Sequence, residues 1–109
     1  MSITGHILII DDEAALRQTL ARILQQAGFE VTTAEDGEQG LSFIQTTNFD
    51  LIFMDLRMPG MPGMEVLKLI HASYPNLPVI LFTAQPDLHS AVDALRNGAT
   101  DYLLKPLKP

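Results

Sequence analysis

The fold is decided by the stretch His6-Ile7-Leu8-Ile9-Ile10-Asp11-Asp12, a short and largely apolar run that ends in two carboxylates. Three later runs follow the same plan: residues 50–54 end in Asp55, residues 78–82 in Thr83, and residues 101–104 in Lys105-Pro106. Short apolar runs that do not alternate with polar residues are typical of strands buried on both faces of a parallel sheet. In such a sheet the four ends meet at one edge, where α/β folds bind ligands. That edge would hold three carboxylates, a hydroxyl and an ammonium, which together can bind a divalent cation and accept a phosphoryl group.

The segments between these runs carry apolar residues at helical spacing. The first helix is expected to end at Gly28, residues 29–33 to form a further strand, and Asp36 to cap the next helix. The last helix is expected to carry Leu88, Ala91, Val92 and Leu95 on one face and to end at Asn97-Gly98.

The resulting order of elements is β-α-β-α-β-α-β-α-β, with no repeat, linker or low-complexity tract. This alternation predicts an α/β, doubly wound fold with five parallel strands, right-handed crossovers and helices on both faces. The chain stops at Leu107-Lys108-Pro109, soon after the fifth strand, so the final helix of the pattern is missing. We therefore expect residues 1–109 to form one domain that is truncated at its C-terminus, with an uncovered face that favours self-association.

The amino-acid composition excludes several classes of protein and of binding site. The 109 residues carry a net charge of −6, and 47% are hydrophobic, which fits one globular domain and argues against disorder. The absence of cysteine excludes disulfides and thiolate metal sites. No apolar run approaches the roughly 18 residues of a membrane span, and no basic signal-peptide region is present, so a cytoplasmic location without membrane contact is expected. The basic residues are scattered, which argues against direct nucleic-acid binding by this domain.

These motifs resemble those of the receiver domain of two-component response regulators, over about residues 7–106. The resemblance rests on Asp11-Asp12, on Met54-Asp55-Leu56-Arg57-Met58-Pro59-Gly60, on Thr83-Ala84 and on Lys105-Pro106. It implies a flavodoxin-like sheet with strand order 2-1-3-4-5. It also implies a phosphorylation-activated signalling switch, with transcription regulation as one possible output. The phosphoryl donor would be a sensor histidine kinase or a phosphotransfer protein.

The resemblance gives each residue of the site a role. Asp55 would be the phosphoacceptor, a carboxylate that forms a mixed anhydride with phosphorus. Mg²⁺ (or Mn²⁺) would be held by Asp11, Asp12, Asp55 and the backbone carbonyl of Arg57, because such cations prefer oxygen ligands. Lys105 would pair with the phosphoryl group as a point charge. Three carboxylates and one lysine give the site a net negative charge, which also favours the binding of a divalent cation.

The remaining roles concern the switch and the loop geometry. Thr83 would donate a hydrogen bond to a phosphoryl oxygen, and Tyr102 would then turn inward; a half-buried core tyrosine is an equal alternative on sequence grounds. The Lys105-Pro106 peptide bond would be cis. Asp12 could act as a helix N-cap as well as a metal ligand.

The main alternative is a haloacid-dehalogenase-like aspartyl-phosphate phosphohydrolase, which uses the same Asp, Thr, Lys and Mg²⁺. In that class the nucleophile ends the first strand and a second Asp lies two residues on, whereas Asp11 and Asp12 are adjacent. A phosphate-independent interaction module is disfavoured because every site residue is present. A dinucleotide-binding domain is excluded because no Gly-x-Gly-x-x-Gly follows the first strand. We therefore expect no enzymatic activity other than self-catalysed phosphoryl transfer and autodephosphorylation.

Overall fold

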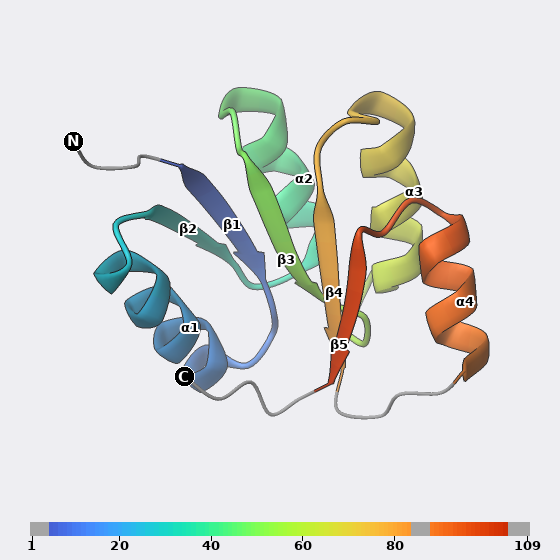
Figure 1. The fold of residues 1–109 in the computed structure, drawn as a ribbon, viewed down its shortest axis with the longest axis horizontal. Coiled ribbons are helices and arrows are strands. Elements are labelled where there is room, and N and C mark those ends of the chain that lie inside the picture. The colour runs from blue at the N-terminus through green and yellow to red at the C-terminus, as the bar shows by residue number, and fades with distance from the viewer. Residues whose placement is uncertain (1–4, 84–87, 105–109) are drawn as a thin grey trace.

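The computed structural model describes residues 5–83 and 88–104 of the chain. Five parallel strands form one sheet in the order β2-β1-β3-β4-β5 (Figure 1). The strands are β1 (His6–Ile10), β2 (Glu30–Ala34), β3 (Leu51–Asp55), β4 (Val79–Thr83) and β5 (Asp101–Leu104). The predicted α/β fold and its strand order 2-1-3-4-5 are confirmed.

Four helices alternate with the strands in the described residues: α1 (Ala14–Gln26), α2 (Gly37–Thr46), α3 (Gly63–Ser73) and α4 (Leu88–Arg96). The expectation of a missing final helix concerns residues after β5, which lie outside the described part of the chain. No helix in the described part has the length and apolarity that a membrane crossing requires.

The alternating side chains of the central strands build two hydrophobic clusters, one on each face of the sheet. The larger cluster joins Leu8 and Ile10 of β1 to buried residues of α2, α3 and α4, among them Ile44, Val66 and Ala94. The smaller cluster joins Ile7 and Ile9 to Leu20 of α1. Both faces of β1 are covered by helices. This explains why its apolar residues are continuous and do not alternate with polar ones.

Helix α2 approaches the sheet and α3 unusually closely. A Cβ atom on Gly40 would lie 2.4 Å from Cδ1 of Ile10, and one on Gly37 would lie 2.4 Å from Cγ2 of Val66. Glycine at these two positions therefore lets α2 pack directly against β1 and α3. This packing fixes the β2–α2 loop next to the carboxyl edge of the sheet.

The predicted helix limits are largely confirmed. The carboxylate of Asp36 accepts a hydrogen bond from the Gln39 amide at 2.8 Å, so Asp36 caps α2. Gly28 follows α1 with φ of 102°, a conformation in which glycine is favoured.

One sequence prediction about the helices was wrong, and the burial of α4 is a further finding. The N-cap of α1 is Glu13, with no side-chain capping bond, so Asp12 does not cap the helix. In α4, Ala94 is buried while Val92 and Leu95 are 38% and 51% exposed. Helix α4 lies beside β5 at the edge of the sheet (Figure 1).

Candidate functional site

Three carboxylates meet at the carboxyl edge of the sheet. Asp11 directly follows β1, and Asp55 is the last residue of the adjacent strand β3. One oxygen from each of Asp11, Asp12 and Asp55 lies within 4.8 Å of the other two. Asp11 is fully buried and Asp55 is 5% exposed, whereas Asp12 is exposed to solvent. The structure therefore brings together the three predicted metal-binding side chains.

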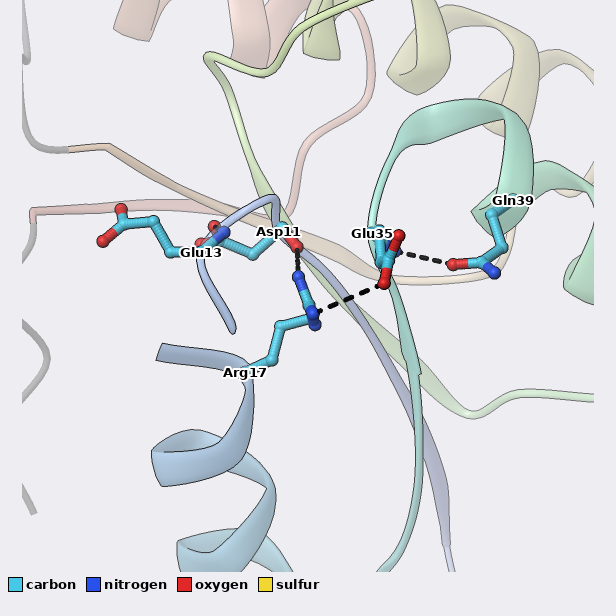
Figure 2. Close-up of polar contacts among 5 residues, drawn as sticks. All are labelled: Asp11, Glu13, Arg17, Glu35 and Gln39. Carbon is cyan, nitrogen blue, oxygen red and sulfur yellow. Dashed lines mark hydrogen bonds and ion pairs between the residues drawn. The ribbon is translucent and has the colours of Figure 1, made fainter. Parts of the chain in front are cut away.

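The backbone around Asp11 is held by several hydrogen bonds. Its amide donates to the carbonyl of Ala34 in β2 at 3.1 Å. Its Oδ1 atom accepts a hydrogen bond from the amide of Glu13 at 2.8 Å, which closes a tight turn around the acidic pair. Figure 2 shows this turn at the start of α1. The turn exposes Asp12 while Asp11 stays buried.

Asp55 is held in a similar way. Its Oδ1 atom accepts a hydrogen bond from the backbone amide of Arg57 at 3.1 Å. The chain then folds back, so that the amide of Gly63 donates to the carbonyl of Leu56 at 3.2 Å. A Cβ atom on Gly63 would lie 2.5 Å from that carbonyl oxygen and 2.8 Å from the carbonyl oxygen of Asp55. Glycine is thus required where α3 starts against the acceptor loop.

Thr83 and Tyr102 lie on the two strands beyond β3. Thr83 is the last residue of β4 and is fully buried, one position beyond Phe82, which pairs with Asp55. Tyr102 is half-buried on β5, where it pairs with Leu81 and packs against the larger cluster. The predicted switch residues therefore sit on adjacent strands at the same end of the sheet as Asp55.

Two predicted site features are not tested by the structure. Lys105 and Pro106, with the cis bond expected between them, lie outside the described residues. The backbone amide of Arg57 is placed by its bond to Asp55, but the role of its carbonyl as a metal ligand stays a prediction.

The charge arrangement favours a cation between the carboxylates. Two unit charges about 5 Å apart repel by roughly 3 kcal/mol at an effective dielectric of about 20. A bound divalent cation would remove this repulsion, and carboxylate and carbonyl oxygens are suitable ligands for Mg²⁺. The donor set present in the described residues, three carboxylates at the edge of one sheet, therefore fits Mg²⁺.

Asp12 borders a hollow in the surface. This depression has a volume of about 470 Å³, and its lining is mostly charged: Asp12, Arg17, Glu35, Asp36, Glu38, Pro59 and Gly60. Sequence reasoning did not single out Arg17 or Glu35. The available signal was the position of Arg17 one turn into a helix, because helical side chains lean toward the helix N-terminus and thus toward Asp11.

The family follows from comparison with known proteins. A family model described as the response regulator receiver domain matches residues 7–109. The chain belongs to the response regulator receiver family.

Relatives of this receiver domain include transcriptional regulators. The DNA-binding transcriptional regulator NtrC of Klebsiella pneumoniae is 46% identical over 102 residues, which cover 94% of this chain but only 22% of NtrC. The CheY-like receiver domain protein of Methanospirillum hungatei superposes with a TM-score of 0.94 at 34% identity, covering 98% of this chain and 86% of that chain. The response regulator TrrA of Thermotoga maritima, solved in complex with Mg²⁺-BeF, has a TM-score of 0.87 at 35% identity and covers 95% and 89% of the two chains.

These findings identify the chain as the receiver domain of a two-component response regulator. They give no support to the phosphohydrolase alternative. The chain spans about a fifth of the length of NtrC.

Proposed function

We propose that this receiver domain is a phosphorylation-activated switch in which Asp55 accepts a phosphoryl group from a histidine kinase or a phosphotransfer protein. A carboxylate oxygen of Asp55 attacks phosphorus, the bond from phosphorus to the donor's imidazole nitrogen breaks, and an aspartyl phosphate forms. Water later attacks the same phosphorus, which releases inorganic phosphate and restores the carboxylate. The domain turns over no outside metabolite in this scheme.

The observation that carries the proposal is the convergence of Asp11, Asp12 and Asp55 within 4.8 Å. These carboxylates, with the carbonyl of Arg57, would hold Mg²⁺ (or Mn²⁺). When bound, the ion supplies positive charge that offsets both the carboxylates and the incoming phosphoryl oxygens. The structure of TrrA, a response regulator solved in complex with Mg²⁺-BeF, supports the proposal that this domain binds a divalent cation.

Thr83 and Lys105 would act on the phosphoryl group itself. Thr83 is buried at the end of β4, on the strand next to Asp55, where its hydroxyl could donate to a phosphoryl oxygen. Lys105 directly follows β5 in the sequence and would supply a compensating positive charge.

The output would be carried by the surface around α4 and β5. Tyr102 lies on β5, on the strand next to Thr83, so movement of Thr83 toward a phosphoryl group would open space for the ring. Such a local change is how a modification biases a two-state surface. DNA-binding regulators are among the relatives, so control of transcription is the proposed output of the whole protein.

Several further expectations stay predictions from the sequence. They are the truncated single domain over residues 1–109, self-association through an uncovered face, the absence of direct nucleic-acid binding and a cytoplasmic location.

The proposal is tested by intact-mass measurement after incubation with acetyl phosphate. The wild-type chain should gain one phosphoryl group with Mg²⁺ and none with EDTA. The Asp55→Asn variant should gain none under either condition. An adduct on Asp55→Asn, or one that forms equally well in EDTA, would contradict the proposal.

A further inference from the structure

Arg17 contacts the backbone of Asp11, the first residue of the acidic pair. It lies one turn into α1, and its side chain is only 15% exposed. Its Nη1 atom donates a hydrogen bond to the backbone carbonyl oxygen of Asp11 at 2.7 Å, and its Nη2 atom lies 3.8 Å from Oε1 of Glu35 (Figure 2). Arg17 therefore joins the β1–α1 turn to the β2–α2 loop.

The contact with Asp11 has a clear structural cause. Strand β1 ends at Ile10, whose partners are Ala34 on β2 and Met54 on β3. Asp11 lies beyond these last pairs and is buried, and a buried backbone carbonyl oxygen is normally paired. The guanidinium of Arg17 donates to this oxygen. A hydrogen bond from a charged donor is stronger than one from a neutral group.

The contact with Glu35 orients the Arg17 side chain but contributes little to the stability of the fold. The Glu35 side chain is 72% exposed, and an ion pair at that exposure contributes little. The backbone of Glu35 is nevertheless fixed, because its amide donates to Oε1 of Gln39 at 2.7 Å. The amide of Gln39 in turn donates to the cap residue Asp36 at 2.8 Å. Figure 2 shows the guanidinium of Arg17 between Asp11 and Glu35, with Gln39 beyond Glu35.

We propose that Arg17 is a positioning residue for the metal site, a role that rests on the proposed function of the three carboxylates. By holding the carbonyl of Asp11, Arg17 fixes the turn in which the amide of Glu13 binds the Asp11 carboxylate. That turn sets the positions of Asp11 and Asp12 as metal ligands. Residues that orient metal ligands commonly change metal affinity about 10- to 100-fold when they are replaced.

If Arg17 acted only through its charge, its replacement would strengthen Mg²⁺ binding rather than weaken it, which makes the proposal testable. A positive charge close to the site repels a cation, so a role as a charge predicts tighter Mg²⁺ binding when Arg17 is neutralised. Arg17→Lys separates the two effects, because it keeps the charge but loses the planar fork that reaches both loops. Arg22→Lys is a matched control, since Arg22 is an exposed residue of the same helix.

Mg²⁺ affinity of the full 109-residue chain is measured by calorimetric titration. We expect Arg17→Lys to bind Mg²⁺ about tenfold more weakly than wild type, while Arg22→Lys is unchanged. Wild-type affinity in Arg17→Lys, or tighter binding in Arg17→Met than in wild type, would overturn the proposal.

Amide hydrogen exchange without metal gives a second readout. In Arg17→Lys the Glu13 amide should exchange faster, whereas the Ile52 amide, which donates to the carbonyl of Pro78 at 3.0 Å, should keep its protection. Equal losses at both amides would show a global loss of stability and would overturn the positioning role. If wild type bound no Mg²⁺, the proposed function would fail, and exchange at Glu13 would still decide whether Arg17 holds the turn.

Discussion

The carboxylates of Asp11 and Asp55 are both buried, and oxygens of the two residues lie within 4.8 Å of each other across the adjacent strands β1 and β3. Each carboxylate accepts a hydrogen bond from a backbone amide two residues further on, Glu13 for Asp11 and Arg57 for Asp55. The folded chain thus holds like charges close together in a setting with little water. That arrangement costs stability unless a cation is present.

The first prediction concerns this repulsion. Asp55→Asn removes one charge of the cluster, so it should raise the free energy of unfolding of the metal-free domain by about 1–3 kcal/mol. It should also reduce the stabilisation that added Mg²⁺ gives through binding to the folded state. Denaturant melts with Mg²⁺ and with EDTA measure both effects. Glu30→Gln, an exposed acidic residue on β2, is the control and should change neither. A metal-free Asp55→Asn variant less stable than wild type would refute the repulsion argument.

The second prediction concerns Thr83. Thr83→Ala should leave phosphorylation of Asp55 possible but weaken the conformational response, because it removes the hydroxyl that would donate a hydrogen bond to the phosphoryl group. Thr83→Ser keeps the hydroxyl and should respond like wild type. Intact mass measures the first property, and amide exchange of α4 with and without phosphorylation measures the second. Complete loss of phosphorylation in Thr83→Ala would show that Thr83 is catalytic or structural rather than part of a switch.

The third prediction concerns the two tyrosines. Fluorine NMR of the fluorotyrosine-labelled chain should show one signal that shifts when Mg²⁺ and beryllium fluoride are added. That signal should be Tyr102, which lies on the strand next to Thr83, and Tyr74, 41% exposed after α3, should be unaffected. Assignment uses Tyr102→Phe and Tyr74→Phe. If the Tyr102 signal did not shift on activation, Tyr102 would be a core residue without a switching role.

The fourth prediction concerns the start of α3. Gly63→Ala would push a methyl group against two backbone carbonyl oxygens, which cannot move aside as a side chain can. We expect a loss of about 3 kcal/mol in unfolding free energy and slower phosphorylation, since the acceptor loop must shift. Gly60→Ala is the comparison: its φ of 80° is strained, but the nearest atom to its Cβ is 3.5 Å away. A smaller loss at Gly63 than at Gly60 would contradict this account.

Most of the fold and the acidic site could be predicted from the sequence because they depend on local patterns. Buried apolar runs followed by Asp11, Asp55 and Thr83 are enough to place these side chains at one edge of a parallel sheet. The strand limits differ in detail, since Asp55 and Thr83 are the last residues of their strands.

What the sequence did not predict depends on tertiary contacts. Arg17 is one of several scattered basic residues, and its position one turn into a helix is the only sequence signal of the contact, because its target is a backbone carbonyl, which every residue carries. The exposure of α4 was also not predicted, because periodicity places apolar residues on one face of a helix but does not tell how much of that face is covered. Ala94 is buried there, and Leu95 is exposed.

The central claim is that Asp55 is the phosphoacceptor, and the most direct test is to locate the phosphoryl group. The chain is incubated with acetyl phosphate and Mg²⁺ and then reduced with borohydride, which converts an aspartyl phosphate to homoserine. Peptide sequencing by tandem mass spectrometry then reads the converted position. The account predicts conversion at position 55 and at no other aspartate. Conversion at position 11 or 12, or none at all in a fully phosphorylated sample, would contradict it.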